Sequence, residues 1–360
     1  MNIGILSMQR VRNYGSFLQA LGLKTEIERL GHNVVFVDFD VNPRISNQAW
    51  KNWFLFYSLR KIKGRREVKM YYRQPSVFDE SDKILGLSNE LQLRKKVDVL
   101  VIGSDEVFNF IQNTPQIGYS PELLGAHSRA DKVISYAASC GNLTIEKIQK
   151  FNKTALTSKL LKRFHQISVR DKNTGELVYK LAGRVPEYHL DPVLIAEYDD
   201  IFVDNLDLEN YILIYGYPGR FSAEEGRSIK EFAQQTGRKL ISIGGAQSFC
   251  DQNIMSSPLQ VLAYFKHADC VITDTFHGTI FSIINHKPFV TVVRSDATVG
   301  YGNENKVLDL LERLGLEERQ LKSMGHLAAQ MNEPIDYDQV DAIRLRERER
   351  TREYLKNNLK

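Results

Sequence analysis

The sequence predicts an α/β protein with two doubly wound parallel sheets that follow one another along the chain. Short apolar runs rich in β-branched residues alternate with longer amphipathic stretches along almost the whole chain, an order typical of sheets covered by helices on both faces. The runs form two groups, separated by an acidic, irregular stretch at residues 195–210. A chain of 360 residues is also long enough for two domains.

Nine apolar runs predict strands, because runs without polar alternation suit strands buried on both faces. They are residues 2–6, 34–39, 97–103, 132–137 and 165–170 in the first group, and 211–216, 239–244, 270–274 and 289–293 in the second. After the first run, apolar residues recur every three or four positions from Phe17 to Leu30. This spacing predicts an amphipathic helix, and Gly31 stands where such a helix would end.

The domain limits follow from the two groups of runs. We expect a first domain over residues 1–200 and a second over 201–338. The remaining segment, 339–360, predicts a helix whose Glu and Arg residues pair three positions apart, as Glu347 and Arg350 do. A closing helix often crosses back to the first domain in two-sheet enzymes, and we expect the same of this one.

Composition excludes several classes of protein. Hydrophobic residues make up 42% and charged residues 26% of the chain, which is an ordinary globular balance. No apolar run approaches the ~20 residues that span a bilayer, and the N-terminus lacks the pattern of a secretion signal, so we expect a cytoplasmic protein. The three cysteines lie far apart without a CxxC pair, which argues against a disulfide framework and against a structural zinc site.

Charge is unevenly distributed along the chain. The net charge is +4, but residues 50–73 alone carry +7 and residues 342–360 carry +4, so the rest is acidic. Such a chain is a poor general binder of nucleic acid, although it could hold an anionic substrate. Segment 50–73 also contains both tryptophans. It could lie on an anionic membrane surface at the inner face of the membrane, or form a lid or a contact between subunits.

Several common motifs are absent. The sequence has no GxxxxGK[ST] loop, no GxGxxG after the first strand, and neither HExxH nor GxSxG, which argues against P-loop and dinucleotide chemistry. The acidic pair Asp38 and Asp40 imitates the DxD of some glycosyltransferases. Its place at the end of a strand favours an ordinary loop. We predict no metal site.

Polar residues follow the strands of the first predicted sheet, at the edge where open α/β sheets bind ligands. Asn13 and Ser16 can cap a helix after the first strand, and Gly15 leaves room for a close approach to the backbone. Asp105 follows the third run, where it could accept a proton from a sugar hydroxyl or cap a helix. Arg170 leaves the fifth run, where it could hold an anion or form a surface pair.

The most informative segment is CVITDTFHGTIFSIINHKPFV, residues 270–290. A strand stops at Asp274, a tight turn follows, and a helix runs onward through Ile283. His277 would therefore lie at the positive end of a helix, beside Gly278 and free backbone amides. This arrangement suits a phosphate and supplies an imidazole that can donate a proton.

Together these segments resemble the polysaccharide pyruvyl transferase family. The resemblance covers most of the chain and rests on NYGSFLQA, VIGSDEVFN, SYAAS, SVRD, LDP, TDTFHGTIFSI with KPFV, and NENKVLDLLERLGLEER, in this order. It implies two Rossmann-like domains that face each other across a cleft, as in GT-B glycosyltransferases. It also implies transfer of the enolpyruvyl moiety of phosphoenolpyruvate to sugar hydroxyls, without a cofactor.

The resemblance also implies roles for single residues. His277 would contact the donor and act as general acid, Arg170 would bind its anionic end, and Asp105 would be the base for the acceptor. Gly278 and Thr279 would donate backbone hydrogen bonds to phosphate. The residues expected to face the acceptor are Asn13, Tyr14, Gly15, Ser16, Gln19 and Ser104.

One position departs from the family pattern. Thr275 stands two positions before the histidine, where some members carry a basic residue, so the missing charge must come from elsewhere, with Arg294 and Lys306 as candidates. Two other functions stay open. One is a glycosyltransferase that uses a nucleotide sugar, and the other is a saccharide-binding or scaffold protein without catalysis.

Overall fold

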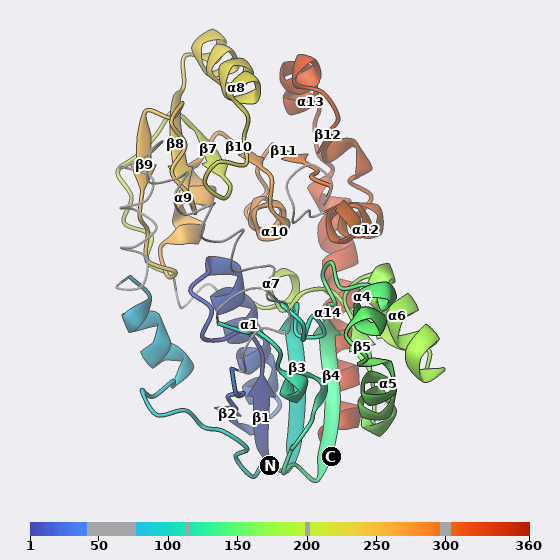
Figure 1. Cartoon of the computed structure of the whole chain (residues 1–360). Helices are drawn as coiled ribbons and strands as arrows, with labels where there is room; N and C mark the ends of the chain where they lie inside the picture. The colour runs from blue at the N-terminus through green and yellow to red at the C-terminus, as the bar shows by residue number, and fades with distance from the viewer. Residues whose placement is uncertain (42–76, 113–115, 199–201, 296–303) are drawn as a thin grey trace.

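The computed structural model contains two parallel six-stranded sheets, one above the other in Figure 1. It describes residues 1–41, 77–112, 116–198, 202–295 and 304–360. The strand order is β2-β1-β3-β4-β5-β6 in the first sheet and β12-β11-β10-β7-β8-β9 in the second. In each sheet the chain adds strands first on one side of the domain's first strand, β1 or β7, and then on the other side. This order confirms the predicted doubly wound α/β fold.

All nine predicted runs contain a strand. In the first sheet these are β1 (Asn2–Leu6), β2 (Asn33–Phe36), β3 (Val99–Asp105), β4 (Lys132–Ala138) and β5 (Ser168–Val169). In the second they are β7 (Tyr211–Tyr215), β8 (Lys239–Ile243), β10 (Cys270–Thr273) and β11 (Phe289–Val292). The run predicted over 165–170 is reduced to two strand residues, whereas β3 continues two residues past its predicted end and carries Asp105 at its tip.

Three further strands were not predicted. They are β6 (Glu187–Tyr188), β9 (Gln252–Ile254) and β12 (Gln320–Leu321). Each is an edge strand of its sheet. Edge strands of two or three residues need no apolar run, because one side of them faces no further strand. Their sequences therefore carry no strand pattern.

Helices cover both faces of each sheet (Figure 1). Those packed with the first sheet are α1 (Tyr14–Arg29), α4 (Ile145–Lys150), α5 (Thr154–Arg163), α6 (Lys172–Ala182) and α7 (Pro192–Ile195). Those of the second part are α8 (Ala223–Thr236), α9 (Val261–His267), α10 (Phe276–Ile284), α12 (Glu304–Leu314) and α13 (Leu327–Asn332), followed by α14 (Tyr337–Asn358). The predicted cap of α1 is confirmed, since the Asn13 side chain accepts hydrogen bonds from the amides of Gly15 and Ser16.

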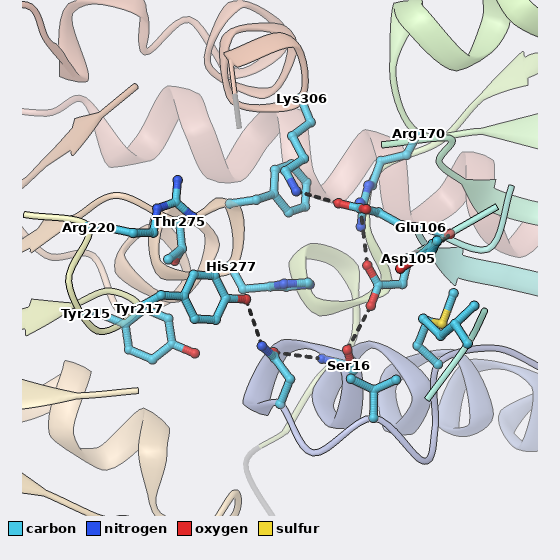
Figure 2. A pocket seen from close by; sticks show the side chains of 16 residues that line it. Ser16, Asp105, Glu106, Arg170, Tyr215, Tyr217, Arg220, Thr275, His277 and Lys306 are labelled. Atoms are coloured by element: carbon cyan, nitrogen blue, oxygen red, sulfur yellow. Dashed lines mark hydrogen bonds and ion pairs between the residues drawn. The ribbon is translucent and has the colours of Figure 1, made fainter. Parts of the chain in front are cut away.

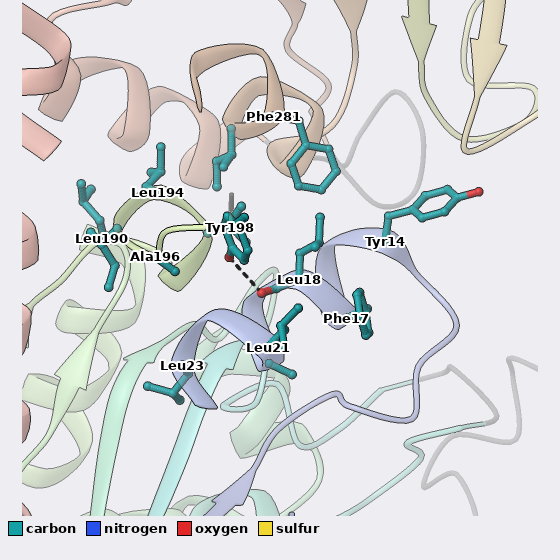
Figure 3. Packing of buried hydrophobic residues seen from close by; sticks show 14 of the residues in the cluster. Tyr14, Phe17, Leu18, Leu21, Leu23, Leu190, Leu194, Ala196, Tyr198 and Phe281 are labelled. Atoms are coloured by element: carbon teal, nitrogen blue, oxygen red, sulfur yellow. Dashed lines mark hydrogen bonds between the residues drawn. The ribbon is translucent and has the colours of Figure 1, made fainter. Parts of the chain in front are cut away.

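One hydrophobic cluster joins the two halves of the molecule. It contains residues of both sheets, and at its centre α1, α7 and α10 pack together (Figure 3). Phe17, Leu194 and Phe281 are buried there, and the Tyr198 hydroxyl donates to the Leu18 carbonyl at 3.1 Å. This shared core turns the carboxyl ends of the strands of both sheets toward one another.

The last helix crosses back to the first domain, as predicted. Near the start of α14, the Tyr337 hydroxyl donates to the carbonyl of Lys287 in the second domain, at 2.5 Å. Near its end, Tyr354 donates to the carbonyl of Ser135 in β4, at 2.7 Å. Figure 1 shows α14 running behind the first sheet to the end of the molecule where both termini lie. The domain limits at 200 and 338 stay predictions.

The basic segment 50–73 lies outside the described residues, so its contact with a membrane stays a prediction. Among the helices that the structure does describe, none combines the length and the apolar character that crossing a bilayer requires.

A buried histidine under α14 predicts loss of stability in mild acid. His189 lies between Tyr136 and Tyr354, with Nδ1 2.8 Å from the Ser168 hydroxyl. Burial, together with Arg350 and Arg313, lowers its pKa to about 3. The unfolded chain takes up this proton below about pH 6.5, whereas the folded protein does not, so stability falls as the pH decreases toward 3.

We therefore expect the unfolding free energy of the wild type to drop by about 2 kcal/mol more between pH 7 and pH 5 than that of His189→Gln. Urea denaturation at both pH values measures this difference. An equal drop in the two proteins would show that His189 is not the group responsible.

Candidate active site

A cavity of about 260 Å³ opens where the strand ends of the two sheets face each other. The first domain contributes residues that follow β1, β3 and β5 to its wall, and the second contributes the ends of β7 and β10 and the start of α12. Figure 2 shows side chains from both domains converging on this space. Ligands of open α/β folds bind at this edge of the sheet.

His277 enters the cavity from the first turn of α10. Thr275 caps this helix, since its hydroxyl accepts a hydrogen bond from the Gly278 amide at 2.9 Å. The imidazole lies against the backbone at the start of α1, where a methyl group on Gly15 would overlap its Nδ1 atom. Nε2 is buried and has no hydrogen-bond partner within the described parts of the chain. Gly15 therefore makes room for the imidazole.

This close approach predicts a coupled effect on stability. Gly15→Ala should destabilise the protein by about 1–3 kcal/mol, because the added methyl group forces the imidazole or α1 to move. In a His277→Ala background the same substitution should be neutral or stabilising, since Ala favours helical backbone more than Gly does. Chemical denaturation of the four proteins gives the coupling energy. Equal costs in both backgrounds would place the clash elsewhere.

Asp191 lies buried between His277 and Arg170. It caps α7 through the Val193 amide, accepts from the Arg170 Nη1 at 2.5 Å, and lies 3.6 Å from the His277 Nε2. Burial alone would raise the pKa of this carboxyl, but the facing imidazole and guanidinium outweigh it and lower the pKa to about 2. An ionised carboxylate thus fixes the positions of both side chains.

Asp105 ends β3 in the first domain, with its backbone in the left-handed region at φ 71°. Its carboxylate accepts a hydrogen bond from the Ser16 hydroxyl at 2.9 Å and lies 3.8 Å from the Arg170 Nη2 (Figure 2). A carboxylate and a hydroxyl from the first domain thus share the cavity with the imidazole from the second.

Three cations line the cavity. Arg170 packs over the ring of Phe276, 4.2 Å from its centroid. Lys306 of α12 pairs with Glu106 across the two domains at 2.6 Å. Arg220, from the loop after β7, pairs with Asp274 at 2.9 Å. Asp105 and Glu106 line the same cavity and offset part of this charge, and an anion bound there would meet cations from both domains.

The sequence matches the family model of polysaccharide pyruvyl transferases over residues 13–296. The chain belongs to this family. No curated protein matches the sequence.

Solved structures share the fold at low sequence identity. Arabidopsis thaliana UGT89C1, complexed with UDP-L-rhamnose, is 12% identical, covers 99% of this chain and 97% of its own, and has a TM-score of 0.50. The S. aureus MnaA-UDP structure is 9% identical over 97% of this chain and 90% of its own, with a TM-score of 0.49. The first similarity shows the predicted GT-B-like arrangement of two Rossmann-like domains, and nothing beyond the fold.

Seven of the fourteen residues that the family resemblance singled out meet in the cavity. They are Asn13, Ser16, Asp105, Arg170, Thr275, His277 and Lys306. The geometry brings them together from both domains, and their binding and catalytic roles stay predictions.

The amides of Gly278 and Thr279, predicted to contact phosphate, are both bonded within the helix start in this structure, and their phosphate contacts stay a prediction. The Gly278 amide donates to the Thr275 hydroxyl, and the Thr279 amide donates to the Thr275 carbonyl. Gly278 instead allows Thr273 and Tyr215 to pack closely on the helix. The amides of Phe276 and His277 precede these bonds and remain the donors at the helix start.

Four predicted acceptor residues are absent from the cavity lining: Gly15, which packs against His277, and Tyr14, Gln19 and Ser104. The Tyr14 hydroxyl donates to the Ser256 carbonyl at 2.8 Å. Gln19 donates to Ser7 and Ser16, and the Ser104 hydroxyl donates to the Ala137 carbonyl. All three side chains are buried within the fold, so they support the cavity wall.

Arg294, one of two candidates for the charge missing at Thr275, lies outside the cavity lining. Its guanidinium pairs with Glu225 at 2.6 Å and lies 3.6 Å from Asp274. The loop cation Arg220 reaches the cavity instead.

The acidic pair after β2 is part of an ordinary loop, as expected. The Asp38 carboxylate accepts hydrogen bonds from Nε and Nη2 of Arg10, and Asp40 forms an ion pair with Arg94. In the described residues, no group of three His, Cys, Asp or Glu side chains is arranged to hold a metal ion.

Asp191, Tyr217 and Arg220 are site residues that the sequence reasoning missed. Asp191 belongs to LDP, one of the segments that resemble the family, but the sequence alone assigned it no role. Tyr217 and Arg220 follow β7 directly, so their place at the carboxyl edge of the second sheet was a usable signal.

Proposed function

We propose that this protein transfers the pyruvate moiety of phosphoenolpyruvate to sugar hydroxyls of a surface polysaccharide or its lipid-linked precursor, forming a pyruvate ketal. The observation that carries the proposal is the meeting of His277 and Asp105 from different domains in one cavity lined by cations. Membership of the polysaccharide pyruvyl transferase family supports the type of transfer.

Ketal formation needs one proton donor and one acceptor for the hydroxyl protons. A proton adds to C3 of phosphoenolpyruvate, so that the methylene becomes a methyl group and C2 becomes an oxocarbenium centre. One sugar hydroxyl bonds to C2 and loses its proton, phosphate leaves with its bridging oxygen, and a second hydroxyl bonds to C2 and loses its proton. One of these protons replaces the one given to C3, and the other leaves with phosphate.

The chain offers a group for each step. His277 acts as the general acid, and the Asp191 carboxylate, 3.6 Å from its Nε2, holds the ring at the cavity wall. Asp105 accepts the hydroxyl proton, with Ser16 holding its carboxylate. Arg170 and Lys306 attract the anionic donor. Asn13, at the first-domain side of the cavity, offers polar contact to the acceptor.

Thermal unfolding with ligands tests the proposal. Phosphoenolpyruvate at 100 times its dissociation constant should stabilise the wild type by about 2.7 kcal/mol, which gives a clear rise in Tm. His277→Ala should lose most of this rise, whereas His286→Ala should keep it. His286 is a matched control because it follows the same helix but pairs with Asp341 outside the cavity.

The alternatives give other patterns of stabilisation. A rise in Tm with nucleotide sugars and none with phosphoenolpyruvate would overturn the proposal in favour of a glycosyltransferase. Incubation with phosphoenolpyruvate and a panel of methyl glycosides, followed by mass spectrometry, then tests for the ketal itself.

A further inference from the structure

Arg220 occupies a place in the cavity that the proposed mechanism does not yet use. It lies in the loop between β7 and α8, beside Thr275 and Tyr217 (Figure 2). Its side chain is 13% exposed, so the guanidinium is largely removed from water and still borders the cavity. A buried cation at a cavity wall is costly unless its donors find partners.

One edge of this guanidinium is fixed by the protein. Its Nε lies 2.9 Å from the Asp274 carboxylate, which is fully buried, and its Cζ lies 5.6 Å from the ring centroid of Tyr217. Burial raises the pKa of the Asp274 carboxyl to about 6, although Arg220 and Arg294 act in the opposite direction. Asp274 and Tyr217 together set the orientation of the planar group.

The end of the guanidinium, formed by its two Nη atoms, has no partner among the described residues. Nη2 is buried and, like Nε, makes no hydrogen bond to any of them, so the contact with Asp274 is an ion pair only. A guanidinium presents its donors as a rigid fork, and the fork matches two oxygens of one phosphate or carboxylate. The edge not used by Asp274 is therefore shaped for an anion in the cavity.

The charge of Asp274 does not by itself require an arginine at position 220. Arg294 also approaches this carboxylate, at 3.6 Å, and does so from outside the cavity lining. The other cavity arginine, Arg170, faces two carboxylates, Asp191 and Asp105. Both arginines keep a buried nitrogen without a hydrogen bond among the described residues, but Arg220 pairs with a single carboxylate there, Asp274. Its charge is therefore the less compensated of the two, which suits the more highly charged end of a donor.

We propose that Arg220 binds the phosphoryl group of the donor through the donor edge that Asp274 leaves open. Asp274 is then a positioning residue, which holds the guanidinium without touching the ligand. This inference rests on the proposed function, since it takes phosphoenolpyruvate as the donor. In this arrangement Arg220, in the loop between β7 and α8, supplies the positive charge that some family members carry at the position of Thr275.

The test measures binding of two probes, phosphoenolpyruvate and inorganic phosphate, to the full chain by calorimetry. Arg220→Gln should weaken both by about 10- to 100-fold, because a charge-assisted hydrogen-bond pair is lost. Arg220→Lys should recover part of the loss, since it keeps the charge without the fork. Arg294→Gln is the matched control, because it removes the other arginine beside Asp274, and it should bind both probes within about threefold of the wild type.

Three outcomes would overturn the inference and leave the proposed function standing. Arg220→Gln could bind both probes like the wild type. It could lose phosphoenolpyruvate but keep phosphate, which would assign Arg220 to the carboxylate end. Arg294→Gln could lose as much as Arg220→Gln. If the wild type binds neither probe, the proposed function itself fails.

A second variant covers the case in which Arg220→Gln does not fold. Arg220→Gln combined with Asp274→Asn removes both charges of the buried pair, so that no lone carboxylate remains. Weak binding of phosphate by this folded double variant supports the inference, and binding equal to that of the wild type contradicts it.

Discussion

Replacing His277 by glutamine should lower kcat for pyruvyl transfer from phosphoenolpyruvate by about 10²- to 10⁴-fold, the usual contribution of a general acid. Glutamine is polar and of similar size, so it can fill the space between Gly15 and Asp191, but it cannot give up a proton to carbon. We expect KM for phosphoenolpyruvate to change much less than kcat, because the glutamine amide, unlike the methyl group of His277→Ala, keeps a hydrogen-bond donor beside the donor substrate.

Release of inorganic phosphate in steady state measures both constants. His286→Gln is the matched control, since its imidazole is half exposed and pairs with Asp341. A His277→Gln enzyme with nearly full kcat would remove the imidazole from the proton transfer. A large rise in KM alone would assign it to donor binding instead.

Replacing Asp191 by alanine should have the largest effect on stability, a loss of about 3–5 kcal/mol, which is typical when one partner of a buried ion pair is removed. Arg170 is almost fully buried, and Asp191 is its closest carboxylate, at 2.5 Å, against 3.8 Å for Asp105. Without Asp191 the guanidinium would stay buried with its charge poorly compensated.

Urea denaturation at pH 7 measures this loss. Asp204→Ala is the control, because Asp204 pairs with Lys266 at 2.7 Å on the surface, where such pairs contribute about 0–1 kcal/mol. Equal losses in the two variants would contradict the interpretation.

The ionised Asp191 carboxylate also predicts how the stability of the protein depends on pH in acid. Because its folded pKa is about 2 and its ordinary value is 3.8, the stability that Asp191 contributes is present above about pH 4 and is lost as the pH falls toward 2. Asp191→Asn should therefore show a weaker dependence of stability on pH in this range than the wild type.

The fold could be predicted because its strands are buried on both faces, and such burial leaves apolar runs in the sequence. The runs NIGIL and YILIY need no tertiary information to be interpreted as strands. The short strands EY, QNI and QL carry no such pattern, since their pairing depends on a neighbouring strand already in place.

The candidate site was predicted in part, for a related reason. His277 and Asp105 each follow a buried run, so their position at a sheet edge could be inferred locally. Which side chains near them turn inward could not, because that depends on how the domains pack. Ser104 precedes Asp105 in the sequence but bonds into β4, and Arg220 meets Asp274 from a separate loop.

The path of α14 has a consequence for how the protein is made. During synthesis on the ribosome, this helix emerges only after both sheets. Until then, the face of the first sheet that receives Tyr354 lies uncovered in the nascent chain, and Tyr136 lacks its contact with Thr351. The first domain therefore cannot complete its core in the order of its own sequence, and it depends on the second domain having been translated.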